Sequence, residues 1–240
     1  MTISKFFALA TVFVAAFTFG SCSKDDDDEK EKTVVENNPK FGDHEYVDLG
    51  LPSGTLWATC NVGASKPEEY GDYFAWGETQ TREKYSWDDY KWGGAFRSHS
   101  PITKYCIDSS LGTVDNRTEL LPEDDAATAN WGSSWRTPSS AQINELCNPS
   151  YTTTEWTALN GVNGLKITSK KNGKSLFLPA AGECNLVLGF VGAHGYYWSR
   201  SLFPEGSVWA YNLNFYTNVV DCSGDDRMYG RSVRPILLQK

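Results

Sequence analysis

The chain has 240 residues, and its 30 acidic side chains outnumber its 22 Lys and Arg side chains, which gives a net charge of −8. Nucleic-acid binding requires clustered Lys and Arg residues, and the absence of such clusters excludes a nucleic-acid partner. Aromatic residues make up 14% of the chain, and long helical periodicity is missing. This composition predicts an exported, β-rich domain with extensive loops.

The N-terminus predicts export and lipid anchoring. After Lys5 comes an apolar run of about 15 residues, shorter than the roughly 20 residues of a membrane-spanning helix, so we expect a signal peptide over residues 1–21. Gly20-Ser21-Cys22 resembles a bacterial lipobox, in which the signal is cut before the cysteine and the thiol is acylated. The alternative is an ordinary signal peptide whose first mature cysteine joins a disulfide. We expect Cys22 to be the lipid anchor, because its polar surroundings offer no packed environment.

Residues 22–40 predict an acidic, disordered linker. Four consecutive aspartates follow Lys24, and because like charges repel each other, the segment cannot bury a core. Ser23-Lys24-Asp25-Asp26-Asp27 resembles the export tag that directs lipoproteins of Bacteroides-type bacteria to the outer face of the outer membrane. We therefore expect a protein that is lipid-anchored in the outer membrane and exposed at the cell surface. Residues 41–240 are long enough for one domain with a substantial core.

The first half of this domain predicts a hairpin, a strand and a long loop. Residues 46–49 and 55–59 are strand-like and flank the turn former Pro52-Ser53-Gly54. Residues 68–79 are aromatic and punctuated by glycine, which indicates a strand that enters a loop. Residues 80–118 lack periodicity, and we expect their aromatic side chains to anchor the loop on the core rather than to contact a ligand.

Two short, core-packed helices are predicted next. In LPEDDAATANWG, Pro122 suits a first helical turn, and the three acids after it complement the positive end of the helix dipole. In WRTPSSAQINELCN, Thr137 can cap a helix that has Pro138 at its first position. Ile143 and Leu146 then share one face.

The second half predicts strands. Asn172-Gly173 lies between two alternating apolar runs and indicates a hairpin in which both turn residues have positive φ. Residues 197–201 are expected to pair with residues 209–215. In the second of these strands an apolar set alternates with a polar set, so we expect one face in the core and one on display. The apolar set is Trp209, Tyr211, Leu213 and Phe215, and the polar set includes Asn212 and Asn214. Residues 230–238 predict a final strand.

Without Cys22 the chain has five cysteines, namely Cys60, Cys106, Cys147, Cys184 and Cys222. Because five is odd, at least one thiol is expected to stay free or to pair between chains. One or two disulfides can form in an oxidising compartment, but the spacing does not assign them. No CxxC motif occurs, so we predict no zinc site, and nothing indicates another metal or a cofactor.

Six ordered segments carry a resemblance to a known family. They are YVDLGLPSGTLWATCNVGA, EEYGDYFAWGET, LPEDDAATANWGSSWRTPS, SLFLPAAG, GYYWSR and YGRSVRPI. Residues 42–238 thereby resemble the major paralogous domain first described in Fibrobacter succinogenes. The resemblance implies an α+β, C-type lectin-like fold, related to the formylglycine-generating-enzyme group. In that fold two short helices flank small antiparallel sheets, and the strand near Tyr46 is expected to pair with the strand near Val233. The family brings no catalytic motif.

The residues that catalysis would need are scattered. His44, His99 and His194 are isolated and show no paired ligand spacing, and no G-x-S-x-G elbow occurs. Cys184 and Cys222 are too far apart for the paired cysteines of the formylglycine-generating relatives. A glycosidase would need two carboxylates at a fixed separation, which the sequence cannot place; the acids available are Glu68, Glu69, Asp88, Asp89 and Glu183. We therefore predict a protein that is not an enzyme.

Calcium motifs of sugar-binding C-type lectins are also missing. Pro204-Glu205-Gly206 and Trp209-Ala210-Tyr211 stand where those lectins would have their calcium-binding triplets. Residues 221–227, DCSGDDR, hold three carboxylates, and we interpret them as a solvated turn in preference to a cation loop. No metal ligands are predicted.

Binding is the function that the C-terminal residues favour. Rigid aromatic side chains mixed with hydrogen-bonding neighbours are typical of recognition surfaces. We expect an extracellular glycan or protein as the ligand. A structural or adhesion component of a surface assembly and a glycan-processing enzyme remain as alternatives. The candidate ligand-binding residues are Tyr197, Trp198, Arg200, Asn212, Asn214, Asn218, Asp221, Asp225 and Arg227.

Overall fold

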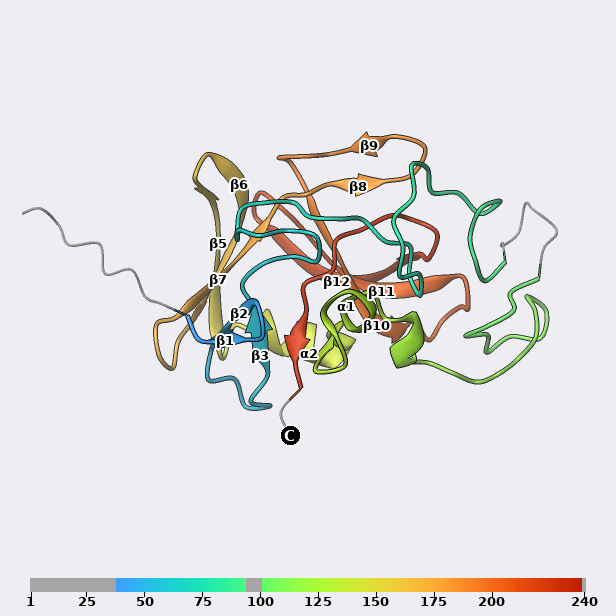
Figure 1. Cartoon of the computed structure of the whole chain (residues 1–240), viewed down its shortest axis with the longest axis horizontal. Coiled ribbons are helices and arrows are strands. Elements are labelled where there is room, and N and C mark those ends of the chain that lie inside the picture. Colours follow the sequence, from blue (N-terminus) through green and yellow to red (C-terminus); the bar gives the residue numbers. More distant parts are fainter. Residues whose placement is uncertain (1–37, 94–100, 239–240) are drawn as a thin grey trace, which may run out of the picture. The chain divides into compact units, whose positions relative to one another are not determined.

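A computed structural model describes residues 38–93 and 101–238, and all of them belong to one compact unit (Figure 1). The predicted signal peptide, Cys22, most of the acidic linker and His99 lie outside the described residues. Small antiparallel sheets and two short α-helices make up this unit, which is an α+β fold.

The two ends of the domain meet in a five-stranded sheet. Its spatial order is β1 (Lys40–Phe41), β2 (His44–Asp48), β3 (Leu56–Ala58), β13 (Ile236–Leu237) and β4 (Trp135–Arg136). The predicted hairpin of β2 and β3 is confirmed by the pairing of Val47 with Trp57. The expected pairing of β2 with the C-terminal strand is wrong, because β3 lies between them and pairs with Ile236 through Trp57.

The C-terminal strand is also shorter than predicted. Only Ile236–Leu237 forms a named strand, whereas Gly230, Arg231 and Ser232 make isolated bridges to Cys184, Phe74 and Tyr197. Because these bridges go to three different segments, the chain stays extended there without joining one sheet.

Helical segments lie where the sequence predicts them. Pro122–Asp124 forms a 3₁₀ turn η1 with proline in its first turn, and α1 follows over Ala126–Trp131. The second helix, α2, spans Ser140–Leu146, so the expected cap at Thr137 is wrong. Ser139 caps α2 instead, in a reciprocal capping box with Gln142.

The cap of α1 is a buried carboxylate. Asp125 accepts hydrogen bonds from the backbone nitrogens of Ala127 and Thr128, and also from the backbone nitrogen and the hydroxyl of Thr137. Thr137 is therefore held by Asp125 and does not cap α2. One side chain joins the start of α1 to the segment between β4 and α2.

A second sheet consists of β5 (Thr152–Leu159), β6 (Val162–Ser169) and β7 (Ser175–Pro179). Its first turn is a two-residue hairpin, in which Asn160 and Gly161 have φ values of 49° and 83°. The predicted hairpin at Asn172-Gly173 is confirmed, but only Gly173 has a positive φ. This loop is longer than two residues, and the Asn172 side chain donates to the Asp48 carbonyl.

A third sheet consists of β10 (Gly195–Leu202), β11 (Trp209–Tyr216) and β12 (Val219–Asp226). The predicted pairing of β10 with β11 is confirmed. Residues 221–226 lie inside β12 and pair with β11 at every position, so neither a solvated turn nor a cation loop forms there. A separate two-stranded sheet, β8 (Glu183–Cys184) and β9 (Leu188–Gly189), precedes it.

The predicted faces of β11 are partly wrong. Leu213 and Phe215 pack in the main core, but Trp209 is 39% exposed at the end of the strand. The opposite face is covered as well, because Ala210 lies in a second core cluster with Phe74 and Trp76. Asn212 on that face is therefore buried and not on display.

The long segment between residues 80 and 118 has no named helix or strand in its described part, as predicted. Its aromatic side chains do anchor it, since Tyr85, Tyr90 and Tyr105 are buried. The Tyr90 hydroxyl donates to the Trp76 carbonyl and thereby joins the loop to the second core cluster.

The five cysteines within the described residues are all free thiols. Burial raises the pKa of Cys147 to about 12 and that of Cys222 to about 11. A thiol reacts as its thiolate, so at pH 8 we expect iodoacetamide to alkylate both at least roughly 100-fold more slowly than an exposed cysteine. Mass spectrometry of tryptic peptides measures this rate, and the urea-unfolded chain is the control. Rapid labelling of Cys147 or Cys222 in the folded protein would contradict this prediction. A protein mass two hydrogens below that of the free-thiol chain would also contradict it, because it would reveal a disulfide.

Candidate functional site

A buried arginine organises one face of the β10–β12 sheet. Arg231 Nε donates to Glu183 Oε2 at 2.9 Å, and Nη2 donates to Glu183 Oε2 and Asp225 Oδ2, both at 2.5 Å. The guanidinium carbon lies 4.8 Å from the ring centre of Tyr196 and 5.2 Å from that of Tyr229. These five side chains are called the Arg231 cluster below.

Backbone pairing places this arginine. Arg231 pairs with Phe74, and Ser232 pairs with Tyr197, so the C-terminal segment runs beside β10. From there the Arg231 side chain reaches across the sheet to Asp225 on β12, while Glu183 comes from β8. The cluster therefore forms only when segments that are far apart in the sequence come together.

The cluster is buried at its centre and open at its rim. Arg231 is fully buried, and its Nη1 atom has no hydrogen-bond partner among the described residues. The Asp225 side chain is 42% exposed. Burial raises the pKa of the Tyr196 hydroxyl, with the negative Glu183 adding to the effect, and burial also raises the pKa of Tyr229. Both phenols thus stay protonated at neutral pH and can donate hydrogen bonds beside an accepting carboxylate.

An apolar hairpin projects beside the cluster. Leu186 and Val187 are 64% and 73% exposed at the β8–β9 turn, and Figure 1 shows this hairpin along the upper edge of the domain. The hairpin patch is defined by its five exposed apolar side chains, which are Leu186, Val187, Leu188, Phe190 and Val191. No other stretch of the described residues exposes so many large apolar side chains in succession.

The hairpin patch and the Arg231 cluster form a continuous surface. Glu183 belongs to β8, and the Phe190 ring packs against His194 and Tyr196 at centroid distances of 5.1 Å and 6.4 Å. Gly182 allows the close approach at the base of the hairpin, because a Cβ there would lie 2.0 Å from the Gly189 carbonyl oxygen. An apolar projection thus adjoins a polar, aromatic centre.

Four predicted ligand-binding residues are buried, so their expected place on a displayed surface is wrong. They are Tyr197, Trp198, Asn212 and Arg227. Each has an internal hydrogen bond: Tyr197 and Trp198 donate to the carbonyls of Pro179 and Phe74, and Arg227 donates to the carbonyls of Lys104, Tyr105 and Ser207. Asn212 donates to the Ser223 carbonyl. Tyr197, Trp198 and Asn212 are buried because both faces of this part of the sheet are covered. Arg227 follows the end of β12 and is buried because the segments that carry its three carbonyl acceptors pack around it.

The other five predicted residues do not gather at one place. Asp225 belongs to the Arg231 cluster, and half-buried Asn214 donates to the Ser223 hydroxyl on the same strand pair. Asp221 is opposite Asn214 in the register of β11 and β12, and Asn218 forms the turn between those strands, with a φ of 67°. Arg200 donates to the Thr137 carbonyl and forms an ion pair with Glu119.

Sequence reasoning missed most of the surface that the structure assembles. Arg231, Tyr196, Tyr229 and the hairpin patch were not among the predicted binding residues, and Glu183 was considered only as a catalytic acid. The run LVLGFVG between Asn185 and Ala193 was an available signal, because it is apolar without the period of a strand or a helix. That pattern leaves open whether such a run is buried or exposed.

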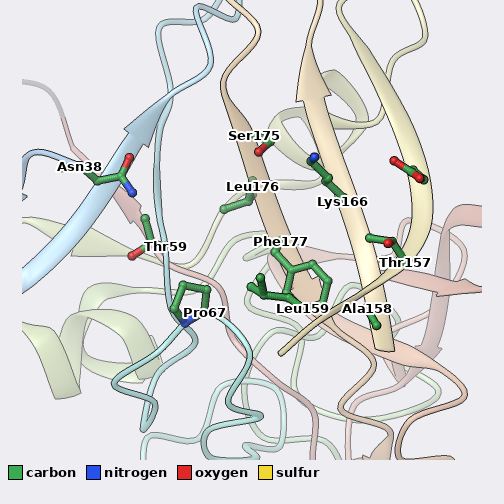
Figure 2. A pocket seen from close by; sticks show the side chains of 11 residues that line it. Asn38, Thr59, Pro67, Thr157, Ala158, Leu159, Lys166, Ser175, Leu176 and Phe177 are labelled. Atoms are coloured by element: carbon green, nitrogen blue, oxygen red, sulfur yellow. The ribbon is translucent and has the colours of Figure 1, made fainter. Parts of the chain in front are cut away.

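A separate cavity of about 420 Å³ lies against the β5–β7 sheet (Figure 2). Strands β5, β6 and β7 contribute Glu155, Lys166 and Phe177 to its lining, and Thr59 and Pro67 contribute from the opposite side. It shares no residue with the Arg231 cluster or the hairpin patch.

No family model, no curated protein and no solved structure matches this chain. Within residues 38–93 and 101–238, no group of three His, Cys, Asp or Glu side chains is placed to hold a metal ion. The described helices are also too short to cross a membrane.

Proposed function

We propose that this chain is a surface lipoprotein, anchored in the outer membrane through Cys22, whose C-type lectin-like domain binds an extracellular protein without catalysing a reaction. The hairpin patch and the Arg231 cluster form the binding surface. Two short helices beside small antiparallel sheets, with both chain ends meeting in one sheet, support this choice of fold. The resemblance of residues 42–238 to the major paralogous domain supports it as well.

The observation that carries the proposal is the exposure of the hairpin patch. Contiguous apolar surface is rare on monomeric soluble proteins and marks sites of interaction. Binding energy concentrates in such a patch when hydrogen-bonding and aromatic groups surround it, as Asp225, Tyr196 and Tyr229 do here.

A protein fits this surface better than a glycan does. Leu186, Val187 and Leu188 are aliphatic and project into solvent, so they offer no hydrogen bonds to the hydroxyl groups of a sugar. They can bury area against an apolar depression on another protein, while Asp225 and the two phenols pair with polar groups at the edge of that contact.

A paired substitution on intact cells tests the proposal. Cells that display the full chain are screened against an array of extracellular proteins, and the protein they bind is titrated against cells that carry Leu188→Asp with Phe190→Asp. Both side chains are at least half exposed, so we expect the fold to stay intact and the affinity to fall at least about 100-fold. The matched control is Val114→Asp with Tyr151→Asp, two exposed apolar positions outside the hairpin patch.

Equal binding by the two double variants, or no protein ligand at all, would overturn the proposed surface. Binding that appears only after the outer membrane is opened would overturn the location at the cell surface. Recovery of the chain in a stable assembly that the hairpin substitutions disperse would favour the alternative of a structural subunit.

A further inference from the structure

We infer that the cavity against the β5–β7 sheet is a second binding site, and that its ligand is a neutral saccharide unit. This site is independent of the protein-binding surface proposed above, with which it shares no residue. Its volume of about 420 Å³ lies within the range of roughly 300–1,000 Å³ that is typical of small-molecule sites.

The sheet builds the floor of this cavity from one row of side chains. Glu155 is opposite Lys166 in the register of β5 and β6, and Lys166 is opposite Phe177 in that of β6 and β7. Opposed residues in a sheet share a face, so an acid, a base and an aromatic ring line up across three strands. The neighbouring Leu165 and Ile167 point the other way, into the main core.

A glycine makes room for the aromatic ring on the floor. A Cβ at Gly164 would lie 2.4 Å from the Leu178 carbonyl oxygen and 2.6 Å from Phe177 Cζ, so a larger residue at this position would displace the ring. Phe177 is buried against this glycine, and Figure 2 shows its ring in the middle of the labelled side chains, beside Leu159. With Pro67 on the opposite wall, it forms the apolar part of the cavity.

The polar groups of the cavity have few internal partners. Among the described residues, no side-chain hydrogen bond or ion pair engages Glu155, Lys166, Thr157 or Ser175. The Thr59 hydroxyl has two long contacts, 3.4 Å to the Glu45 carbonyl oxygen and 3.6 Å to Cys60 Sγ. An acceptor, a cationic donor and several hydroxyls therefore remain available to a ligand.

This set of groups favours a saccharide over a charged ligand. Glu155 and Lys166 balance each other's charge, so neither an anion nor a cation gains from both. A zwitterionic amino acid could use that pair, but it would not engage the hydroxyls of Thr157 and Ser175. A sugar ring has hydroxyls that both donate and accept, which can engage all of these groups while its apolar face rests on Phe177 and Pro67.

Saturation-transfer NMR on the full chain, with a panel of neutral hexose and N-acetylhexosamine oligosaccharides, tests the inference. We expect saturable binding that falls at least tenfold in Thr157→Val and in Glu155→Ala with Lys166→Ala. The matched control is Thr154→Val, which changes an exposed residue of the same type and strand on the opposite face of the sheet. The hairpin variant Leu188→Asp with Phe190→Asp should keep saccharide binding, which separates this site from the protein-binding surface.

Three outcomes would overturn the inference. If no oligosaccharide of the panel binds the chain, the cavity is not a saccharide-binding site. Binding that Thr154→Val and Thr157→Val weaken equally places the ligand elsewhere. Preferential binding of a zwitterionic dipeptide, offered as a competitor in the same experiment, would give the cavity a different ligand class.

Discussion

Replacing Asp125 with alanine is expected to lower the free energy of unfolding by at least about 3 kcal/mol. The Asp125 side chain is fully buried and accepts from Ala127, Thr128 and Thr137. Alanine leaves these donors buried without an acceptor, and each lost partner costs about 1–3 kcal/mol. It also removes the cap of α1, a change that typically costs about 1 kcal/mol.

Urea unfolding followed by circular dichroism measures this loss. The control is Asp108→Ala, because Asp108 makes a similar local pattern of hydrogen bonds to Ser110 but is exposed to water. Water replaces the lost acceptor there, so we expect a change within about 0.5 kcal/mol. Equal effects of the two substitutions would show that Asp125 does not join α1 to Thr137 in the way the hydrogen bonds indicate.

Replacing Arg231 with alanine is expected to cost about 3–5 kcal/mol. Arg231 is fully buried between Glu183 and Asp225, and its guanidinium also packs over the Trp198 ring at 4.7 Å. Without it the two carboxylates lose their shared donor, and the largely buried Glu183 side chain is left without its ion-pair partner. The same change should release β8 and weaken binding at the hairpin patch, because Glu183 ties that hairpin to the sheet.

Two further variants make this prediction specific. Arg231→Lys keeps the charge but not the planar fork that contacts both carboxylates, so we expect it to be destabilised by an intermediate amount. Arg117→Ala removes an arginine whose ion pair with Asp115 is at the surface, and it should cost less than about 1 kcal/mol. If Arg231→Ala were as mild as Arg117→Ala, the cluster would not hold the hairpin in place.

Helices and hairpins were predicted well where the residues that specify them, such as caps and turn formers, lie within a few positions of the element itself. Pro122 and the acids after it indicate the helical segment η1 and α1 because these groups act within one turn. The hairpins of β2 with β3 and of β6 with β7 follow from turn formers between alternating strands. The cap of α2 was misplaced by two residues, because Thr137 and Ser139 are equally good caps until Asp125 holds one of them.

The binding surface was predicted less well, because burial depends on contacts between distant segments. Periodicity correctly placed Asn212 and Asn214 on one face of β11, but whether that face meets water depends on residues 74–76 and 231, which cover part of it. Arginines are seldom fully buried, so sequence reasoning placed Arg227 at the surface. Carbonyl groups from residues 104, 105 and 207 surround it instead.

The sequence by itself determined the β-rich composition, the two short helices and the main hairpins, because turn residues, caps and strand alternation act over a few neighbouring positions. Only the tertiary structure decided that β3 separates β2 from the C-terminal strand, that Arg231 joins Glu183 to Asp225, and that the run from Leu186 to Val191 is exposed. Such features depend on which distant segments pack together. An apolar run has the same pattern whether another segment covers it or leaves it in water.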